Sequence, residues 1–401
     1  MNRGSPWKAM ILLATGTLFA MSLWFSASAV VPVLSKIWNL SESTAAWLTL
    51  SVQLGFVFGT LLSAILNLSD IINARHLLTL CAITAAMCNA LLAWFANGAG
   101  SAIGLRFLTG MFLAGVYPPA MKIMASWFRS GRGMAIGVLI GALTFGKATP
   151  YLINAFQMNN WRNTLIISSA LTIFGAITIL LFLKDGPYAQ PGARFDWTQV
   201  GKVFSNRSVR LANFGYLGHM WELYAMWTWT PVMIRASFAA HHVKPEIAET
   251  ISFLAIAAGA LGCIIAGVLA DRYGRTLVAS TAMVISGACC LFVGFLFDQS
   301  PIWLAIITFV WGISVVADSA QFSASVTELA DQRYIGTALT LQTCLGFLLT
   351  VITIKLIPIF AANFGWRYAF WLLAPGPFLG VLAMLRLRKL PEALRIAQGK
   401  R

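Results

Sequence analysis

The sequence is poor in charged residues. Only 10% of its 401 residues are Asp, Glu, Lys or Arg, whereas soluble domains carry about a quarter. Hydrophobic residues make up 59% of the chain, which is more apolar surface than the cores of a soluble protein of this length can hide. The composition therefore excludes a soluble globular protein and predicts that lipid surrounds most of the chain.

Histidine and cysteine are also scarce. Of the four histidines, three fall in loops or at the edges of apolar stretches, so no nucleophile–base pair or metal cluster can be assembled. The six cysteines contain no C-x-x-C pair, and all lie in apolar stretches where they serve as small packing residues. We therefore expect neither an enzyme nor a metal or other cofactor.

What the sequence has in abundance is apolar stretches of about 20 residues, the length that crosses a bilayer as a helix. The fold class we predict is an all-α membrane protein with twelve transmembrane helices. The expected spans are 9–33, 44–67, 76–96, 101–127, 132–155, 163–183, 209–234, 250–270, 277–297, 302–326, 334–359 and 367–386.

The net charge of +15 could suggest a nucleic-acid partner, but the positions of the basic residues argue against it. With the N-terminus in the cytoplasm, most Lys and Arg residues fall in cytoplasmic segments, as the positive-inside rule requires. No small-residue cleavage site follows the first span, so we expect that span to be retained. The sequence thus predicts a monomeric, multi-pass protein of the bacterial inner membrane with both termini in the cytoplasm.

One polar stretch, from Lys184 to Arg210, divides the apolar pattern near its midpoint. We predict an N-terminal six-helix bundle at 1–183, a cytoplasmic linker at 184–208 and a C-terminal six-helix bundle with a short basic tail at 209–401. The two halves repeat one another, since Arg162 and Arg367 each precede the sixth span of a half and lie 205 residues apart. Duplicated halves of this kind are typical of secondary transporters.

Two motifs resemble those of the major facilitator superfamily. "GVLADRYGR", Gly267–Arg275, is similar to the loop signature of that family, and "LRFLTGMFLAG", Leu105–Gly115, is similar to its fourth-span pattern. The resemblance implies twelve helices in two pseudo-symmetric bundles. It also implies a cytoplasmic gate at the loop signature and its degenerate first copy, formed by Asp70, Arg75, Asp271, Arg272 and Arg275. The alternative is that these charges only set the topology.

Charged residues inside membrane helices are costly and are therefore candidates for function. Glu222 lies about 18 Å into its helix, near the bilayer midplane, with His219 one turn away. Such a carboxylate can carry a proton, and the histidine can share it. Asp318 and Gln321 form a similar pair in the tenth span. We predict proton coupling at Glu222, His219 and Asp318, the alternative being ion pairs within the protein.

Substrate contacts are expected mainly in the N-terminal half. Lys147 lies too deep to reach the cytoplasmic interface, so it requires an anion, either a substrate or a protein acid. The predicted substrate-binding residues are Lys147, Arg106, Trp24, Gln53, Trp229 and Gln321. Trp227 is expected in an aromatic belt at the membrane surface.

These residues favour a secondary active transporter that moves a small organic anion or zwitterion by alternating access, coupled to protons. The alternative function is a proton-driven efflux pump for amphipathic compounds, which the many tryptophans suit. The family's antiporter signature carries a Gly-Pro step in the fifth span, and this sequence has none there.

Overall fold

The computed structural model describes residues 5–128, 132–156, 160–188, 196–331 and 334–401, without the side chains of Glu42, Ser69, Asp70 and Arg132. Helices account for nearly all of this described part, and it contains no strand. Eleven of the described helical segments are long and apolar enough to cross a membrane. A further helix, α10 (Arg207–Ala240), has 34 residues but is more polar than these eleven. The predicted all-α membrane fold is confirmed.

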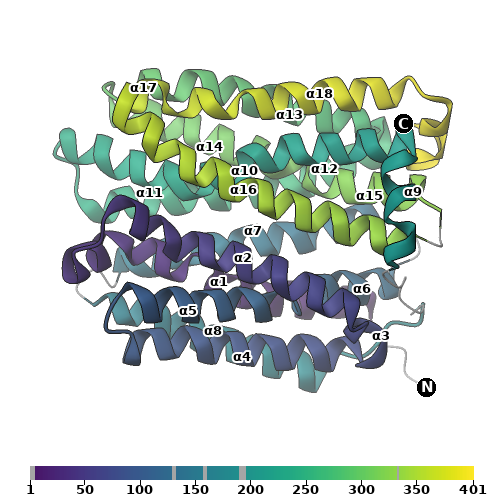
Figure 1. The fold of residues 1–401 in the computed structure, drawn as a ribbon, viewed down its shortest axis with the longest axis horizontal. Coiled ribbons are helices and arrows are strands. Elements are labelled where there is room, and N and C mark those ends of the chain that lie inside the picture. The colour runs from purple at the N-terminus through teal and green to yellow at the C-terminus, as the bar shows by residue number, and fades with distance from the viewer. Residues whose placement is uncertain (1–4, 129–131, 157–159, 189–195, 332–333) are drawn as a thin grey trace. The chain divides into compact units, whose positions relative to one another are not determined.

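Contacts divide the chain into two compact units, which are described separately. The first unit comprises residues 1–191 and 243–257. Its helices are α1 (Pro6–Trp38), α2 (Glu42–Ile65), α3 (Leu68–Ile71), α4 (Ala74–Phe95), α5 (Ala99–Leu113), α6 (Tyr117–Trp127), α7 (Arg132–Phe156), α8 (Trp161–Phe182) and α11 (Pro245–Ala257). Within it, α1 packs against α7 and α8, and α4 packs against α5 and α8 (Figure 1).

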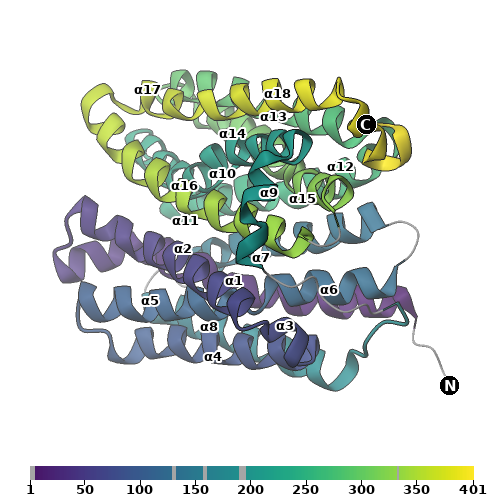
Figure 2. The ribbon, with the colours of Figure 1, turned by 45° about the vertical axis from the view of Figure 1, so that its right-hand side comes forward.

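The second unit comprises residues 192–242 and 258–401. Its elements are η1 (Trp197–Gln199), α9 (Val200–Ser205), α10, α12 (Gly259–Tyr273), α13 (Arg275–Phe292), η2 (Val293–Leu296), α14 (Pro301–Ala317), α15 (Ser319–Leu329), α16 (Ile335–Phe364), α17 (Trp366–Ala369), η3 (Phe370–Leu373), α18 (Pro375–Arg388) and η4 (Pro391–Gly399). Helix α10 is central to this unit, since it contacts α14, α15, α16 and α18. The short α9 lies against α10 and α16 (Figure 2).

Helix α11 lies within the predicted C-terminal bundle at 209–401 but is grouped with the first unit. That helix belongs to the span expected at 250–270, yet it packs against α7 of the first unit, where Phe253 meets Phe145 edge-on at 5.3 Å. The linker at 184–208 and the two six-helix bundles on either side of it stay predictions. At the end of this segment, Asn206 caps α10 by accepting from the amides of Ser208 and Val209.

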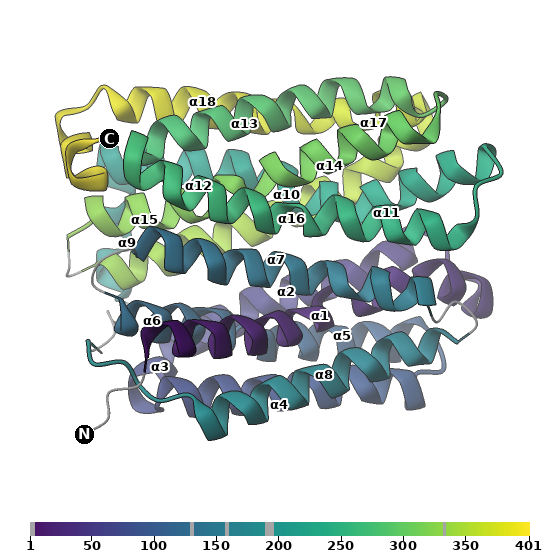
Figure 3. The same ribbon diagram turned by 180° about the vertical axis from the view of Figure 1, so that it is seen from behind.

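Three of the spans are interrupted within their length. The breaks lie between α5 and α6, between α11 and α12, and between α14 and α15. Figure 3 labels α14 and α15, which lie on the two sides of the last break. The last break falls at Asp318, so an ionisable residue occupies the point where the regular helix stops. Discontinuous helices of this kind are typical of transporters, which use the freed backbone groups at binding sites.

Glycines allow close packing of the helices in the first unit. A Cβ atom on Gly55 of α2 would lie 2.0 Å from the carbonyl oxygen of Phe107 on α5, and one on Gly110 would lie 2.1 Å from that of Val52. The backbones of α2 and α5 therefore touch directly, which only residues without a side chain permit.

Candidate functional site

The carboxylate of Glu222 lies inside the second unit, at the middle of α10, and is 1% exposed. It accepts three hydrogen bonds. Trp311 Nε1 donates to Oε1 at 2.5 Å, Cys290 Sγ donates to Oε1 at 3.2 Å, and Ser286 Oγ donates to Oε2 at 2.9 Å. Ser286 and Cys290 lie one turn apart on α13 and so face the same side of that helix. All three donors are uncharged.

His219 and Asp318 form a buried acid–base pair in the same unit. His219 Nδ1 lies 2.8 Å from Asp318 Oδ1, and both side chains are at most 2% exposed. Within the described part of the chain, His219 Nε2 has no hydrogen-bond partner. The structure thus brings together two of the predicted proton-coupling residues, while Glu222 contacts other groups. The sharing of a proton between His219 and Glu222 stays a prediction.

In the first unit, Lys147 lies with its Nζ 4.6 Å from the ring centroid of Trp24. Phe56 meets the same indole at 5.1 Å, and Gln53 is one turn before Phe56 on α2. Gln53 is fully buried, and neither atom of its amide has a partner among the described residues. A buried amide without partners is costly, so Gln53 is suited to bind a polar ligand.

Arg106 is fully buried, and its guanidinium binds protein atoms on three other helices. It donates to the carbonyl of Leu48 on α2, to Asn89 on α4, and to the carbonyls of Leu23 and Trp24 and the hydroxyl of Ser26 on α1. Asn89 continues this network, since its amide donates to Leu165 and Ser169 on α8. Arg106 therefore ties the helices of the first unit together, while its predicted substrate contact stays untested.

Two tryptophans of α10, Trp227 and Trp229, contact other residues of the second unit. Trp229 Nε1 donates to the carbonyl of Ile354 on α16 at 2.8 Å, which anchors its ring inside the second unit. Trp227 is 1% exposed and packs edge-on against Tyr224 at 5.2 Å. The expectation of a membrane-surface belt at Trp227 is wrong, because the neighbouring side chains enclose the ring. The substrate-binding role of Trp229 stays a prediction.

The loop signature holds the second unit together at one end. Arg275 makes a bidentate pair with Glu328 on α15, at 2.8 and 3.0 Å, and also donates to Gln321 Oε1 at 3.2 Å. Glu328 in turn accepts from the amide of Ala397 at 3.0 Å, which fixes η4 against α15. Gln321 thus accepts a hydrogen bond from Arg275. Its substrate-binding role stays a prediction. Gly274 has a φ of 97°, a conformation that favours glycine.

The other gate residues have separate surroundings. Arg75 Nη1 donates to the carbonyl of Leu183 at 2.6 Å within the first unit. In the second unit, the carbonyl of Asp271 accepts from Lys400 Nζ at 2.7 Å, and the guanidinium of Arg272 lies 5.2 Å from the Tyr273 ring. The side chain of Asp70 lies outside the described residues. The gate stays a prediction.

Outside the membrane spans, Asp196 precedes η1. The hydroxyl and the amide of Thr198 both donate to this carboxylate, which holds the pKa of Asp196 below its ordinary value. The amide of Asp196 donates to the hydroxyl of Thr337 at 2.9 Å, so this segment is attached to α16.

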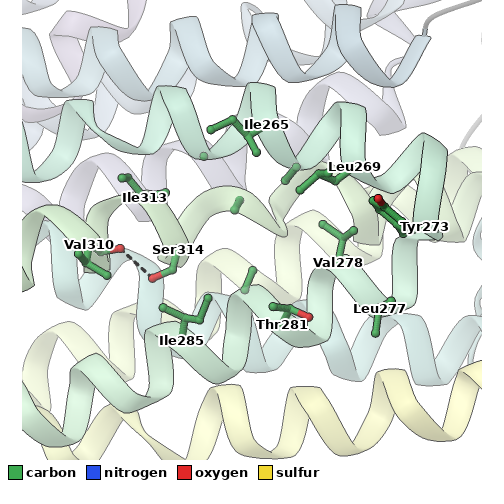
Figure 4. Close-up of a pocket in the computed structure, with 14 residues that line it drawn as sticks. Ile265, Leu269, Tyr273, Leu277, Val278, Thr281, Ile285, Val310, Ile313 and Ser314 are labelled. Carbon is green, nitrogen blue, oxygen red and sulfur yellow. Dashed lines mark hydrogen bonds between the residues drawn. The ribbon is translucent and has the colours of Figure 1, made fainter.

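A groove of about 360 Å³ lies between α12, α13 and α14 in the second unit (Figure 4). Apolar side chains line most of it, with Ile265, Val278 and Val310 among those drawn. The hydroxyl of Ser314 donates to the carbonyl of Val310, so it offers little to a ligand. The groove contains none of the predicted site residues, and its apolar lining suits hydrocarbon rather than a charged substrate.

Comparison with known proteins identifies the family. The sequence model of the Major Facilitator Superfamily matches residues 12–352 and 236–401. The chain belongs to the major facilitator superfamily. Among solved structures, a D-xylose–proton symporter matches with a TM-score of 0.76 at 17% identity, covering 98% of this chain and 99% of its own. A mutant nucleoside transporter matches with a TM-score of 0.69 at 16% identity, covering 95% and 100%. Such identities show the fold alone.

Curated relatives in this superfamily match over shorter stretches. A Staphylococcus haemolyticus protein that carries the provisional name proline/betaine transporter is 27% identical over 43% of this chain and 40% of its own length. The 3-(3-hydroxy-phenyl)propionate transporter of Escherichia coli K12 is 29% identical over 35% of this chain and 33% of its own. The matches thus span about two fifths or less of these relatives. The family model places the chain in a superfamily of membrane transporters and not of enzymes, and the names of both relatives are those of transporters.

The residues that sequence reasoning missed are mainly the partners of the predicted ones. Trp311, Ser286 and Cys290 surround Glu222, and Glu328 binds Arg275. A signal existed for Glu328, which follows Gln321 by seven residues and so lies on the same face of α15. For Trp311 there was none, since a tryptophan in an apolar helix gives no indication of which way its indole points.

Proposed function

We propose that this transporter moves a small organic anion or zwitterion by alternating access, driven by protons that bind to Glu222. The observation that carries the proposal is the surroundings of Glu222. A buried carboxylate is costly in its charged form unless a cation is near, and the groups that contact Glu222 in the described part of the chain are neutral. A proton is the simplest charge that can neutralise it.

The substrate would bind at Lys147, Trp24 and Gln53. An ammonium group suits a carboxylate, and an indole face suits an aromatic ring or a quaternary ammonium. The Gln53 amide supplies an NH₂ donor group and a carbonyl acceptor. The compounds named for the relatives share this chemistry, because proline, betaine and 3-(3-hydroxyphenyl)propionate all carry a carboxylate. A carboxylate-bearing metabolite is therefore the substrate class that we propose.

The protein would act as a monomer in the bacterial inner membrane, with both termini in the cytoplasm and Asp318 with His219 as a second proton site. Asp70, Arg75, Asp271, Arg272 and Arg275 would form the cytoplasmic gate. Their positions in the loop signature and its first copy support this role, as does the pairing of Arg275 with Glu328 at the end of α12 and α13.

The decisive experiment is Glu222→Gln in proteoliposomes, with L-proline, betaine and 3-(3-hydroxyphenyl)propionate as probes. We expect the variant to lose uphill accumulation driven by a proton gradient, since the amide cannot take up a proton. Counterflow exchange of the same probe should persist, because exchange needs no net proton movement. Glu246→Gln, at an exposed glutamate of α11, is the matched control and should retain both activities. Equal loss of accumulation and exchange in Glu222→Gln would refute the proton-carrier role.

A further inference from the structure

We infer that the proton on Glu222 binds at Oε2 and that Ser286 is the positioning residue that makes this possible. The inference rests on the proposed function and concerns which atom of the carboxylate is protonated. It follows from the different capacities of the donors around the two oxygens, which are Trp311 and Cys290 at Oε1 and Ser286 at Oε2.

Oε1 has a donor that cannot change its role. The indole N–H of Trp311 donates only and has no lone pair available to accept. At 2.5 Å from Oε1, it requires that oxygen to remain an acceptor in both states of the carboxyl group. Oε1 also accepts from the Cys290 thiol, so a proton placed on Oε1 would have to displace one of these two donors or require the thiol to turn and act as a weak acceptor. Oε1 is therefore less suited to protonation than Oε2.

Oε2 faces a group that can act in both ways. The Ser286 hydroxyl donates to Oε2 at 2.9 Å, and the carbonyl of Met283 lies 3.3 Å from the same Oγ. When a proton from water bonds to Oε2, Ser286 Oγ can accept from the new O–H while its own hydrogen rotates toward Met283. No bond of serine breaks in this step, and release of the proton to water reverses the rotation. Both states of Glu222 are therefore fully hydrogen-bonded without movement of the backbone.

Other ionisable groups lie on α10 and on the helices around it. Asp318 lies at the junction of α14 and α15, Cys290 donates to Glu222 from α13, and Cys289 precedes Cys290 on that helix. His219 is on the same helix and is paired with Asp318. The other packed helices contribute Cys344 and Lys355 on α16, Glu328 on α15, which is paired with Arg275, and Arg386 and Arg388 at the far end of α18. These groups are unchanged in the variants compared below.

The test is the carboxyl band of Glu222 in pH-difference infrared spectra of the full-length protein, assigned by its loss in Glu222→Gln. Ser286→Ala removes a hydrogen bond to the charged form and one to the neutral form, and the bond to the charged form is the stronger. The titration midpoint of the band should therefore move to higher pH, by about half a unit to one unit. Ser286→Cys, with a weaker donor, should give a smaller shift in the same direction.

Ser280→Ala is the matched control. Ser280 is a buried serine on the same helix whose hydroxyl has no partner in the described residues, so its loss should leave the band unmoved. The pH profile of proton-driven uptake should shift with the band in Ser286→Ala and not in Ser280→Ala. A band with the same midpoint in both alanine variants would overturn the inference. Uphill accumulation that persists in Glu222→Gln would instead overturn the proposed function, while the infrared comparison would still decide the role of Ser286.

Discussion

Arg106 can act either as a structural residue or as a substrate-binding residue. The variant Arg106→Lys distinguishes these two roles. The substitution keeps the positive charge but replaces five N–H donors in a planar fork with three on a single atom. Arg106 donates to five protein groups on three helices, so lysine leaves at least two of them without a donor. Hydrogen bonds from a charged group contribute about 1.5–3 kcal/mol each, which predicts a loss of about 3–6 kcal/mol from the stability of the first unit.

Thermal unfolding of the purified protein in detergent measures this loss. A change of 1 kcal/mol lowers the melting temperature by about 2–4 °C for a unit of this size, so Arg106→Lys should unfold at least about 6 °C below the parent. The exposed Arg162, which donates to the carbonyl of Ala93, is the control, and Arg162→Lys should change the melting temperature far less. The half-saturation constant for uptake should stay within about twofold. An unchanged melting temperature with a half-saturation constant raised tenfold would place Arg106 in the substrate site and refute the reasoning.

Two further substitutions test packing and substrate binding. Gly55→Ala should destabilise the protein by about 1–3 kcal/mol in thermal unfolding, since its Cβ would lie 2.0 Å from the Phe107 carbonyl, whereas Gly104→Ala, with no atom within 4 Å, should not. Equal melting temperatures for Gly55→Ala and the parent protein would show that α2 and α5 can move apart without loss of stability. Lys147→Ala should raise the half-saturation constant for uptake about tenfold or more, because one charged contact with the substrate is lost. Lys355→Ala, at an exposed lysine, is the control and should leave this constant unchanged. Unaltered uptake kinetics in Lys147→Ala would make Lys147 a structural residue.

The fold could be predicted from the sequence because a bilayer imposes one strong rule. Every backbone polar group must find a partner inside the membrane, so long apolar stretches become helices. The loop signature at Gly267–Arg275 then indicated the superfamily. Two of the helix breaks could not be predicted, since Ala258 and Asp318 are not residues that interrupt helices by themselves. Tertiary packing decides them. The break between α5 and α6 had a signal, because Gly115 and Pro118 lie there.

The candidate site was predictable only as a set of residues and not as a set of contacts. A charged side chain inside a membrane helix is energetically costly and is therefore a candidate for function. This argument identified Glu222, Asp318, Arg106 and Lys147 from the sequence. Which partner each residue has depends on helix rotation and on side chains from distant helices. His219 illustrates this, since its position one turn from Glu222 suggested a shared proton, whereas its ring nitrogen lies 2.8 Å from Asp318.

The surroundings of Glu222 bear on how a proton could be coupled to movement. A carboxylate that faced open water would exchange its proton at any time, and the gradient would leak. Glu222 is instead enclosed by α13 and α14, with Trp311 against one oxygen and Ser286 against the other. As the proposed proton carrier, Glu222 would exchange with water only when those contacts loosen, which would require a change in the packing of α10 against its neighbours. Under the proposed function, that requirement restricts proton exchange to the stage of the transport cycle in which this packing is loosened. A ligand can shift the protein toward that stage only by binding the two conformations with different affinities.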